Sequence, residues 1–369
     1  MKITIAGHYT TKIGELWHLG LEDLAREAVE GAVANAKVDL KKIDAVFVAS
    51  KASGSFNNQR HINALVSSFF SHNPPATRIE GACASGGLAL IAAEQSLLSK
   101  ENQTVLVLGV EKMTDVDGVG ATSILSTAAS TQLEGGSTFP GLYALLAQAH
   151  QLEFKTSREI LSAVSVKNHR HALTNPLAQY HKEFTLKQVS NSALVADPLR
   201  LLDCSPVSDG ASAVILTTKN IKNKAQIIGA GHGQDSLDLA HRKSLTELAA
   251  TKRAAKKAFA SSDLTPNKIE AAEVHDCFTI AEILAIEDLG FFPKGGGGKA
   301  TLEGKTERRS KLVVNGSGGL KAFGHPVGAT GVKQVSYLAE QIEKGECGLA
   351  LAHNVGGSGA TAVVHILSK

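Results

Sequence analysis

The sequence predicts an α/β protein built from a duplicated unit, with a large insertion in the first copy. Three observations lead to this prediction. Strand-like apolar runs alternate with segments of helical periodicity, short segments recur in the same order in both halves, and residues 118–203 make the first half longer. At 369 residues the chain is long enough to bury two cores of domain size.

The predicted strands are short runs rich in Val, Ile, Leu and Ala. The first begins almost at once, at Ile3 and Ile5, and the clearest of the others are residues 45–48, 105–108, 213–216, 349–351 and 362–364. Apolar runs of this length, separated by helical segments, are typical of strands buried on both faces of a sheet. The alternation therefore favours an α/β fold.

Three pairs of segments carry the repeat. Lys-Ile-Asp-Ala at 42–45 matches Lys-Ile-Glu-Ala at 268–271, and Ala-Glu-Gln at 93–95 recurs at 339–341. Residues 209–214 resemble residues 358–363. Because the three matches keep their order, we expect two equivalent halves that pack face to face.

The repeat sets the predicted domain organisation. The first half comprises residues 1–117 and 204–220, and the second half comprises residues 221–369. Between them lies an inserted unit, residues 118–203, with helical segments at 143–154 and 158–173. An insertion of this size on a duplicated core is usually a lid or a substrate-binding excursion.

The bulk composition excludes several classes of protein. A net charge of +3 is too small to indicate nucleic acid as a partner, and no apolar stretch reaches the length of a membrane span. The four cysteines are widely spaced and form no C-x-x-C pair, which indicates neither a zinc site nor a disulfide framework. With a strand expected from Ile3, no signal peptide is predicted. We expect a cytoplasmic protein with no bound metal.

Cys83 is the first candidate for chemistry. It lies in Gly-Ala-Cys-Ala-Ser-Gly-Gly at 81–87, just before a predicted helix at 88–99. The positive end of a helix dipole lowers the pKa of a nearby thiol, and bare glycine backbone offers N–H groups to an oxyanion. The alternative is a small cysteine that only packs in a tight turn.

His325 is the candidate partner of Cys83. It stands between Gly324 and Pro326, and Gly-Ala-Thr-Gly follows at 328–331. In the repeat it occupies roughly the place in the second half that Cys83 occupies in the first. A pseudo-twofold axis would bring both loops together, so a Cys–His pair that activates the thiol is predicted.

His275 and Cys277 form the third fragment, His-Asp-Cys-Phe at 275–278. It follows a predicted strand at 271–274 and precedes a helix at 280–289, a usual location for catalytic groups. Cys277 is expected to exchange protons and His275 to donate a hydrogen bond to an enolate. The alternative is that Asp276 caps the helix and Cys277 packs.

With these residues in place, the chain resembles the thiolases, specifically the sterol-carrier-protein-2 type that includes archaeal and bacterial acetyl-CoA C-acetyltransferases. The likeness spans essentially the whole length. It rests on the Cys83 loop, the 275–278 fragment and the His325 loop, together with residues 11–15, 166–170, 203–211 and 318–321. The resemblance implies a duplicated thiolase fold with five layers, α-β-α-β-α, and an inserted loop domain.

The resemblance also implies an activity. A thiolase forms or cleaves acetoacetyl-CoA or a related 3-oxoacyl-CoA by ping-pong Claisen chemistry. Acyl-CoA and coenzyme A are its substrates, and it has no permanently bound cofactor. Cys83 resembles the acylated nucleophile, His325 the residue that activates it, His275 an oxyanion donor and Cys277 the acid/base thiol.

In other thiolases that second thiol comes from a C-terminal Cys-x-Gly loop. The equivalent stretch here, residues 353–357, contains no cysteine. Cys277 supplies the thiol in the subgroup that the chain resembles. A second oxyanion site is expected from the N–H of Cys83 and an N–H of Val355 or Gly356. A homodimer or tetramer, and a complex with a downstream condensing enzyme, are further expectations from the family.

Two alternatives stay open at this point. One is another condensing enzyme of the same fold, a hydroxymethylglutaryl-CoA synthase or a ketoacyl synthase. Such enzymes typically pair Cys with His and Glu, Asn or a second His, so the thiol of Cys277 distinguishes them. The other is a non-catalytic scaffold subunit. The sequence argues against this alternative, because every matched catalytic position is filled.

Overall fold

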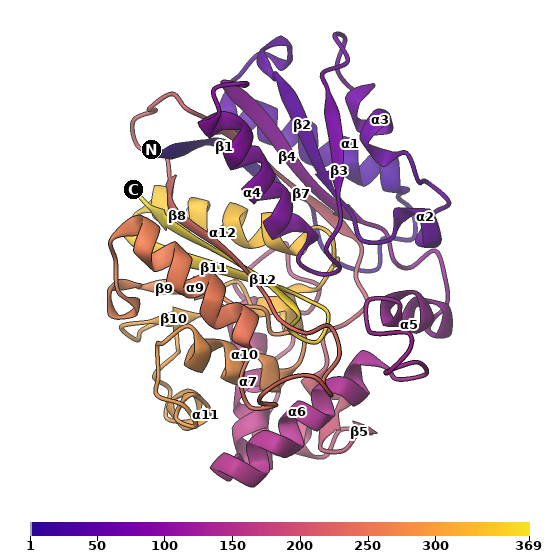
Figure 1. The fold of residues 1–369 in the computed structure, drawn as a ribbon, viewed down its shortest axis with the longest axis vertical. Coiled ribbons are helices and arrows are strands. Elements are labelled where there is room, and N and C mark those ends of the chain that lie inside the picture. Colours follow the sequence, from indigo (N-terminus) through magenta and orange to yellow (C-terminus); the bar gives the residue numbers. More distant parts are fainter. Residues whose placement is uncertain (1) are drawn as a thin grey trace.

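A mixed ten-stranded arrangement runs through the molecule in the order β10-β9-β11-β12-β8-β1-β7-β4-β2-β3 (Figure 1). The computed structural model describes residues 2–369. The first half contains β1 (Ile3–Thr10), α1 (Leu21–Ala36), η1 (Leu40–Lys42), β2 (Ala45–Ala49), α2 (Ser53–Phe56), α3 (Ile62–Ser67), β3 (Ala76–Ile79), α4 (Ser85–Leu98), β4 (Thr104–Glu111) and β7 (Gly210–Thr217).

The second half repeats this plan. It contains β8 (Gln226–Gln234), α9 (Ala249–Ser262), η3 (Pro266–Lys268), β9 (Ala271–Glu273), α10 (Thr279–Asp288), α11 (Gly297–Leu302), β10 (Val313–Val314), the one-turn π-helix η4 (Gly319–Phe323), α12 (Thr330–Lys344), β11 (Leu349–Gly356) and β12 (Thr361–Ser368).

The two halves are topologically equivalent. Each has five strands, β3-β2-β4-β7-β1 in the first and β10-β9-β11-β12-β8 in the second. In each half the three strands farthest from the junction pair in parallel and the other pairings are antiparallel. The halves meet through a short antiparallel contact between β1 and β8, in which Ile3 faces Ile227 and Thr4 faces Gln226.

The segments that recur in the sequence occupy equivalent places, which confirms the predicted duplication. Residues 42–45 and 268–271 each close a one-turn 3₁₀ helix and open β2 or β9. Residues 93–95 lie in α4 and residues 339–341 in α12. Residues 209–214 and 358–363 lead into β7 and β12, the matching strands of the two halves.

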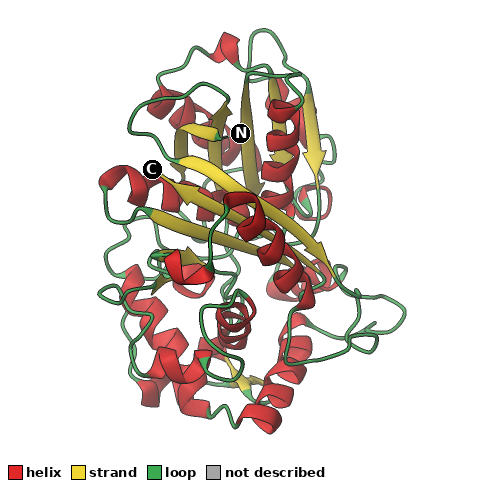
Figure 2. Cartoon of the chain, turned by 60° about the vertical axis from the view of Figure 1, so that its left-hand side comes forward, coloured by secondary structure: helices red, strands yellow, loops and turns green. Residues whose placement is uncertain are grey.

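Helices α4 and α12 form the middle layer. One apolar cluster joins both helices to strands of both halves, with Leu90, Val107, Val335 and Ala350 among its buried members. Outside the strands, α1 covers the first half and α9 covers the second (Figures 1 and 2). The fold is therefore the predicted five-layer arrangement, α-β-α-β-α.

The chain leaves the strands between β4 and β7. This stretch contains α5 (Gly118–Ser126), α6 (Phe139–Phe154), α7 (Arg158–Ala172), α8 (Leu186–Ser190), η2 (Leu201–Asp203) and a two-stranded hairpin of β5 (Leu194–Ala196) and β6 (Leu199–Arg200). In Figure 1, α6 and β5 lie at the bottom of the molecule and α7 just under α10, whereas α5 lies at the right, below the first half. Tyr143 and Leu161 of α6 and α7 share a buried cluster with Cys277 and Ile283. The boundaries drawn for the three units from the sequence stay a prediction.

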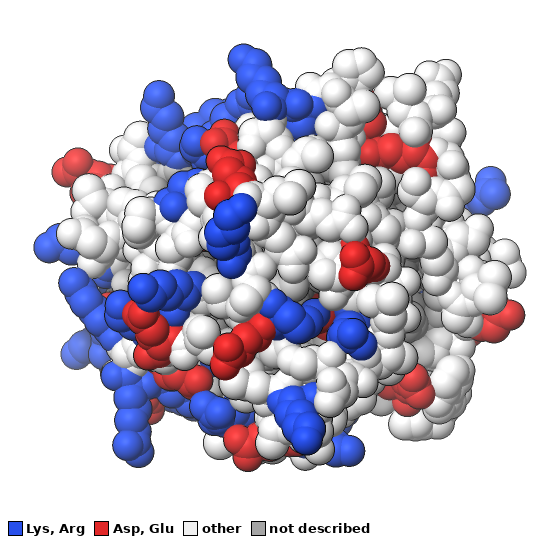
Figure 3. Space-filling model, turned by 90° about the horizontal axis from the view of Figure 1, so that it is seen from below, with Lys and Arg blue, Asp and Glu red and all other residues white. Residues whose placement is uncertain are grey.

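The surface carries both signs of charge. Seen from below, Lys and Arg side chains gather toward the left of the molecule, Asp and Glu lie among them, and much of the right side is uncharged (Figure 3). Across residues 2–369, none of the helices combines the length and the apolar character needed to cross a membrane.

Candidate active site

The first turns of α4 and α12 touch backbone to backbone, and this contact creates the site. A Cβ on Gly331 would lie 2.3 Å from the backbone nitrogen of Gly87, and a Cβ on Gly86 would lie 2.8 Å from the nitrogen of Gly331. Only glycine permits so close an approach. As a result, the turn before α4 and the loop before α12 meet at one point.

Cys83 lies in the turn before α4 and is partly exposed. Ala82 has a positive φ of 53°, a conformation that turns the chain sharply toward the helix. Burial raises the pKa of the Cys83 thiol to about 11, although the charge of Lys51 and the N–H groups of Gly357 and of Cys83 itself favour the thiolate. The expected lowering of this pKa by the helix end is therefore wrong, because desolvation is the larger effect.

Glu111, at the end of β4, ties together the loops around Cys83. Its buried carboxylate accepts hydrogen bonds from the N–H groups of Lys51 (2.8 Å), Ala52 (3.0 Å) and Gly328 (2.9 Å). Gly328 belongs to the second half, three residues after His325. The same carboxylate thus fixes the Lys51 loop and the His325 loop relative to each other.

The hydrogen bonds of His325 define its tautomer. Its Nδ1 lies 2.7 Å from the Thr330 hydroxyl, and that hydroxyl donates its single hydrogen to the carbonyl of Pro326 at 3.1 Å. The Thr330 oxygen therefore accepts from an Nδ1–H group. The other ring nitrogen, Nε2, carries a lone pair and can accept a proton.

His275 has the opposite tautomer, which Asn354 imposes. The Asn354 amide oxygen accepts from Gly87 N–H at 3.0 Å, so its NH₂ group is the one that donates to the Cys83 carbonyl at 2.9 Å and reaches His275 Nδ1 at 3.3 Å. Nδ1 of His275 accepts, so Nε2 carries the hydrogen. That Nε2 is buried and has no partner among the described residues.

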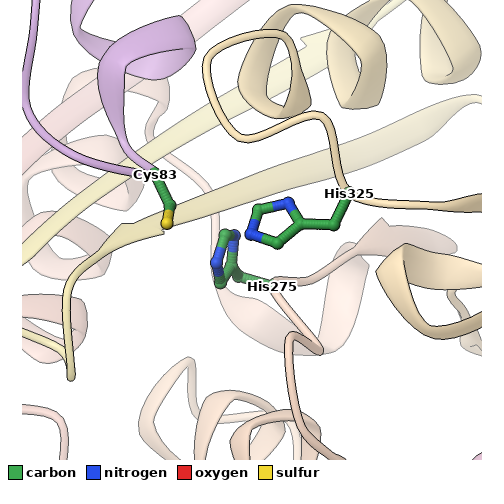
Figure 4. Close-up of side chains that lie close together, drawn as sticks. All are labelled: Cys83, His275 and His325. Atoms are coloured by element: carbon green, nitrogen blue, oxygen red, sulfur yellow. The ribbon is translucent and has the colours of Figure 1, made fainter. Parts of the chain in front are cut away.

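The thiol and the two imidazoles converge. The sulfur of Cys83, one ring nitrogen of His275 and one ring nitrogen of His325 all lie within 4.8 Å of one another. The sulfur points toward the two rings (Figure 4). The rings meet edge to face with centroids 4.9 Å apart. Burial, with a contribution from the charge of Lys333, lowers the pKa of His325 to about 3 and that of His275 well below its usual range. Both rings are neutral at physiological pH.

Among residues 2–369, these three side chains are also the group whose spacing could hold a metal ion. The donor set does not fit one. A metal ligand must offer a lone pair, whereas the Asn354 amide occupies the lone pair on Nδ1 of His275 and leaves a hydrogen on Nε2. The cluster therefore offers one acceptor nitrogen, one donor N–H and a thiol, an arrangement suited to proton transfer.

Cys277 lines the same cavity as Cys83. It follows β9, is almost completely buried, and burial raises the pKa of its thiol well above the usual value. It borders a cavity of about 170 Å³ together with Cys83 and His325. The remaining lining residues are mostly apolar: Met113, Thr122, Leu125, Ser126, Phe139, Pro140, Tyr143, Cys204, Ser205, Pro206, Val207, Phe278, Val327 and Gly357.

Asp276 connects the fragment at 275–278 to the loop that carries His325. Its carboxylate accepts from the N–H groups of Leu320 (2.6 Å) and Lys321 (3.2 Å) in η4, and from the Asn168 amide of α7 (2.7 Å). Burial and the nearby charge of Glu282 raise its pKa to about 7. Asp276 therefore caps a helix, but that helix is η4 and not the expected α10.

The structure brings Cys83, His275, Cys277 and His325 to one place. Val355 and Gly356 are close by, and a Cβ on Gly356 would lie 2.5 Å from the carbonyl oxygen of Gly81. The N–H that reaches the Cys83 thiol belongs to the next residue, Gly357. The oxyanion site predicted from the N–H groups of Cys83 and of Val355 or Gly356 stays a prediction.

Sequence reasoning missed three side chains of the site: Thr330, Asn354 and Tyr143. Thr330 and Asn354 lie inside fragments that the sequence singled out, the 328–331 run and the 353–357 stretch. The available signal was a polar side chain close to glycine, since Thr330 precedes Gly331 directly and Asn354 lies two residues before Gly356. Tyr143 lies far away in the sequence, and nothing local marks it.

A thiol and two neutral imidazoles at the centre of a duplicated α/β fold are the groups that an acyl-transfer or condensing enzyme with a cysteine nucleophile requires. Comparison of the sequence with models of known protein families identifies the family. The model for the thiolase N-terminal domain matches residues 3–220, and the model for the thiolase C-terminal domain-like family matches residues 231–369. The chain belongs to the thiolase family.

Two relatives and one solved structure illustrate the similarity. An acetyl-CoA acetyltransferase of Methanothermobacter thermautotrophicus is 44% identical over 100% of this chain and 99% of its own length. Sterol carrier protein 2 of Bos taurus is 32% identical over 92% of this chain and 67% of its own length. A solved structure titled Ltp2-ChsH2(DUF35) aldolase shares the fold, with a TM-score of 0.86, 22% identity and coverage of 99% of this chain and 97% of that chain.

Proposed function

We propose that this thiolase joins two acetyl-CoA molecules to acetoacetyl-CoA, or cleaves a 3-oxoacyl-CoA with coenzyme A, through an acyl group carried on Cys83. The observation that carries the proposal is the opposed tautomers of the two histidines at one thiol. His325 offers a lone pair and His275 offers an N–H. The 44% identity to an acetyl-CoA acetyltransferase supports the choice of substrate.

In the first half-reaction His325 acts as a base. Because the Cys83 thiol has a raised pKa and His325 is neutral, the thiol proton passes to His325 Nε2 as the sulfur attacks the thioester carbonyl. The carbon–sulfur bond of acetyl-CoA breaks, and the departing coenzyme A thiolate takes the proton from His325. The products are acetyl-Cys83 and free coenzyme A.

In the second half-reaction Cys277 moves the proton. Cys277 first releases its own proton to solvent. The resulting thiolate removes a proton from the methyl group of a second acetyl-CoA, and the His275 Nε2–H bonds to the enolate oxygen. The enolate carbon attacks the acetyl carbonyl on Cys83, a carbon–carbon bond forms, and Cys83 leaves as a thiolate. The proton held by Cys277 then passes to Cys83, and Cys277 takes a proton from solvent, which restores the starting state.

The oxyanion of the acyl-Cys83 intermediate is assigned to backbone donors. The N–H groups of Cys83 and Gly357 already face the sulfur, so they are close to the carbonyl oxygen of any acyl group that the sulfur carries. Preorganised N–H pairs of this kind are a common device for stabilising a tetrahedral intermediate.

Coenzyme A and acyl-CoA are substrates in this scheme, and no permanently bound cofactor takes part. We further propose a cytoplasmic homodimer or tetramer, in which residues 118–203 form a loop domain between two thiolase halves. A complex with a downstream condensing enzyme is proposed because thiolysis is thermodynamically favoured, so synthesis requires a reaction that consumes the product.

Two assays test the function. The loss of enolate absorbance measures thiolysis of acetoacetyl-CoA, and labelled acetyl-CoA measures transfer of the acetyl group to the protein. Cys83→Ala is expected to abolish both turnover and the label. Cys277→Ala is expected to accept the label at Cys83 but not to condense it. Cys347→Ala is the matched control, because Cys347 lies just before β11 and does not line the cavity.

Two results would refute the assignment. One is acetyl labelling of the Cys83→Ala protein at the wild-type level. The other is normal turnover of the Cys277→Ala protein. A loss of activity in Cys347→Ala equal to that in Cys83→Ala would show that the losses come from damage to the fold.

A further inference from the structure

Tyr143 is the one tyrosine that borders the catalytic cavity, and it comes from the inserted stretch rather than from either half of the core. Its side chain is about 1% exposed. The ring packs on Phe278, with centroids 4.8 Å apart and an angle of 33° between the planes. Helix α6 therefore delivers a fixed phenol directly beside the fragment that contains Cys277.

The hydroxyl of Tyr143 has two neighbours that can accept its hydrogen. It donates to the carbonyl of Gly357 at 3.2 Å, and it faces the thiol of Cys277 closely enough to act on its ionisation. A phenol has one hydrogen and can also accept. With the hydrogen on Gly357, the phenol oxygen is free to accept from the Cys277 S–H group.

Gly357 does not depend on this bond for its position. Arg242, in the loop before α9, donates to the carbonyl of Ser358 at 2.7 Å and to its hydroxyl at 3.2 Å. The guanidinium therefore holds the β11–β12 turn from the other side. The Tyr143 hydrogen can leave the Gly357 carbonyl while the turn stays in place.

The ionisable groups that face Cys277 otherwise oppose its ionisation. Burial is the largest effect, and the negative forms of Cys83 and Asp276 add to it. The Arg242 charge acts on Tyr143 and favours the phenolate of that residue. Among these groups, Tyr143 is the side-chain donor positioned to stabilise a thiolate at Cys277.

We propose that Tyr143 is the positioning residue that controls the ionisation of Cys277. Its hydroxyl hydrogen bonds to the Gly357 carbonyl while Cys277 is a thiol, and it turns to the sulfur when Cys277 becomes a thiolate. The insert thus participates in the chemistry of the core. No bond other than hydrogen bonds forms or breaks at Tyr143, and the proton of Cys277 follows the course described above.

This inference rests on the proposed function, because Cys277 needs a stabilised thiolate only if it removes a proton from the second acyl-CoA. It gives Tyr143 an effect on one half-reaction only. Tyr143→Phe removes one oxygen and keeps the ring that packs on Phe278. We expect acetylation of Cys83 to stay near the wild-type rate and the condensation step to slow by about 10- to 100-fold at neutral pH, as the loss of one hydrogen bond to a charged group predicts.

The decisive measurement does not depend on activity. In a Cys83→Ala background, the rate of Cys277 alkylation by iodoacetamide is followed by peptide mass spectrometry between pH 6 and 10, with and without Tyr143→Phe. Only the thiolate reacts, so the substitution should lower the rate at pH 8 by about 10- to 100-fold. Cys204 lines the same cavity and serves as the internal control for access of the reagent. Tyr9→Phe removes a half-exposed hydroxyl bonded to Glu27 and is the matched variant.

The outcomes separate the two proposals. Equal alkylation of Cys277 with and without Tyr143→Phe would overturn the inference, and so would a Cys277 that is unreactive in both proteins. An equal loss in both half-reactions would also overturn it, since that result indicates a general structural role. If the wild-type protein transfers no acetyl group, the proposed function is refuted, whatever the alkylation rates of Cys277 show.

Discussion

Replacing Thr330 by valine tests whether the hydrogen-bond geometry around His325 makes that ring a base. Thr330 is completely buried, and its hydroxyl is the acceptor for His325 Nδ1–H at 2.7 Å. Valine has the same shape but cannot accept. The ring must then bury an unpaired N–H or move its hydrogen to Nε2, which removes the lone pair that faces Cys83.

The magnitude follows from the cost of an unpaired buried donor. Leaving such a group without a partner costs about 1–3 kcal/mol, and about 1.4 kcal/mol corresponds to a tenfold change in rate. Acetylation of Cys83 is therefore expected to slow by about 10- to 100-fold. Substrate affinity should change little, because Thr330 does not line the cavity.

Rapid-quench measurement of acetyl-Cys83 formation from labelled acetyl-CoA would follow this step directly. Thr330→Ser keeps the hydroxyl and should restore most of the rate, which separates the hydrogen bond from the packing of the methyl group. If Thr330→Val acetylates Cys83 within about twofold of the wild-type rate, which is below the effect of even a weak hydrogen bond, the tautomer argument for His325 fails.

Three other predictions follow from buried groups. Lys333→Met removes a charge that lowers the pKa of His325, so the acid limb of the acetylation pH profile should move to higher pH; an unchanged limb would contradict this. Burial lowers the pKa of His353 to about 3, so the unfolded state binds the extra proton as pH falls below about 6.5 and stability is lost on acidification. In His353→Gln the loss between pH 7 and 5, measured by urea unfolding, should be smaller by about 2 kcal/mol; an identical loss would refute the buried neutral ring. Gly331→Ala places a methyl group against the backbone of α4 and should cost about 1–3 kcal/mol or more together with most of the activity, whereas Gly118→Ala, which meets nothing within 4 Å, should be harmless; equal thermal stability of the two variants would contradict the contact.

The architecture could be predicted from the sequence because its signals are local and repeated. Apolar runs such as residues 105–108 sit inside the observed strand β4, and the three recurring segments occupy equivalent positions. Helix α4 shows where local reasoning stops. The sequence predicts this helix from residue 88, but it begins at Ser85, because glycines such as Gly86 and Gly87 favour a loop unless a contact such as that with α12 requires them in a helix.

The site was predicted in part for a similar reason. Cys83, His275, Cys277 and His325 each stand in a distinctive fragment, so their chemistry was visible one residue at a time. The ionisation of Cys83 was not, since it depends on burial by elements that are distant in the sequence.

The partners of the site are harder still to predict. Asn354 hydrogen bonds to three groups in two separate parts of the chain, the Cys83–Gly87 segment and His275, and Tyr143 enters from the insert. Their roles are properties of the assembled fold, and a linear pattern does not encode them.

The crossing of α4 and α12 lies at the internal symmetry axis of the molecule. Two identical half-chains paired in the same way would place like against like at this point, either two thiols or two imidazoles. A thiol opposite an imidazole requires the two copies to differ in sequence. Because a single polypeptide carries both copies, every molecule pairs one Cys83 loop with one His325 loop, and the glycines at the crossing hold the two loops together.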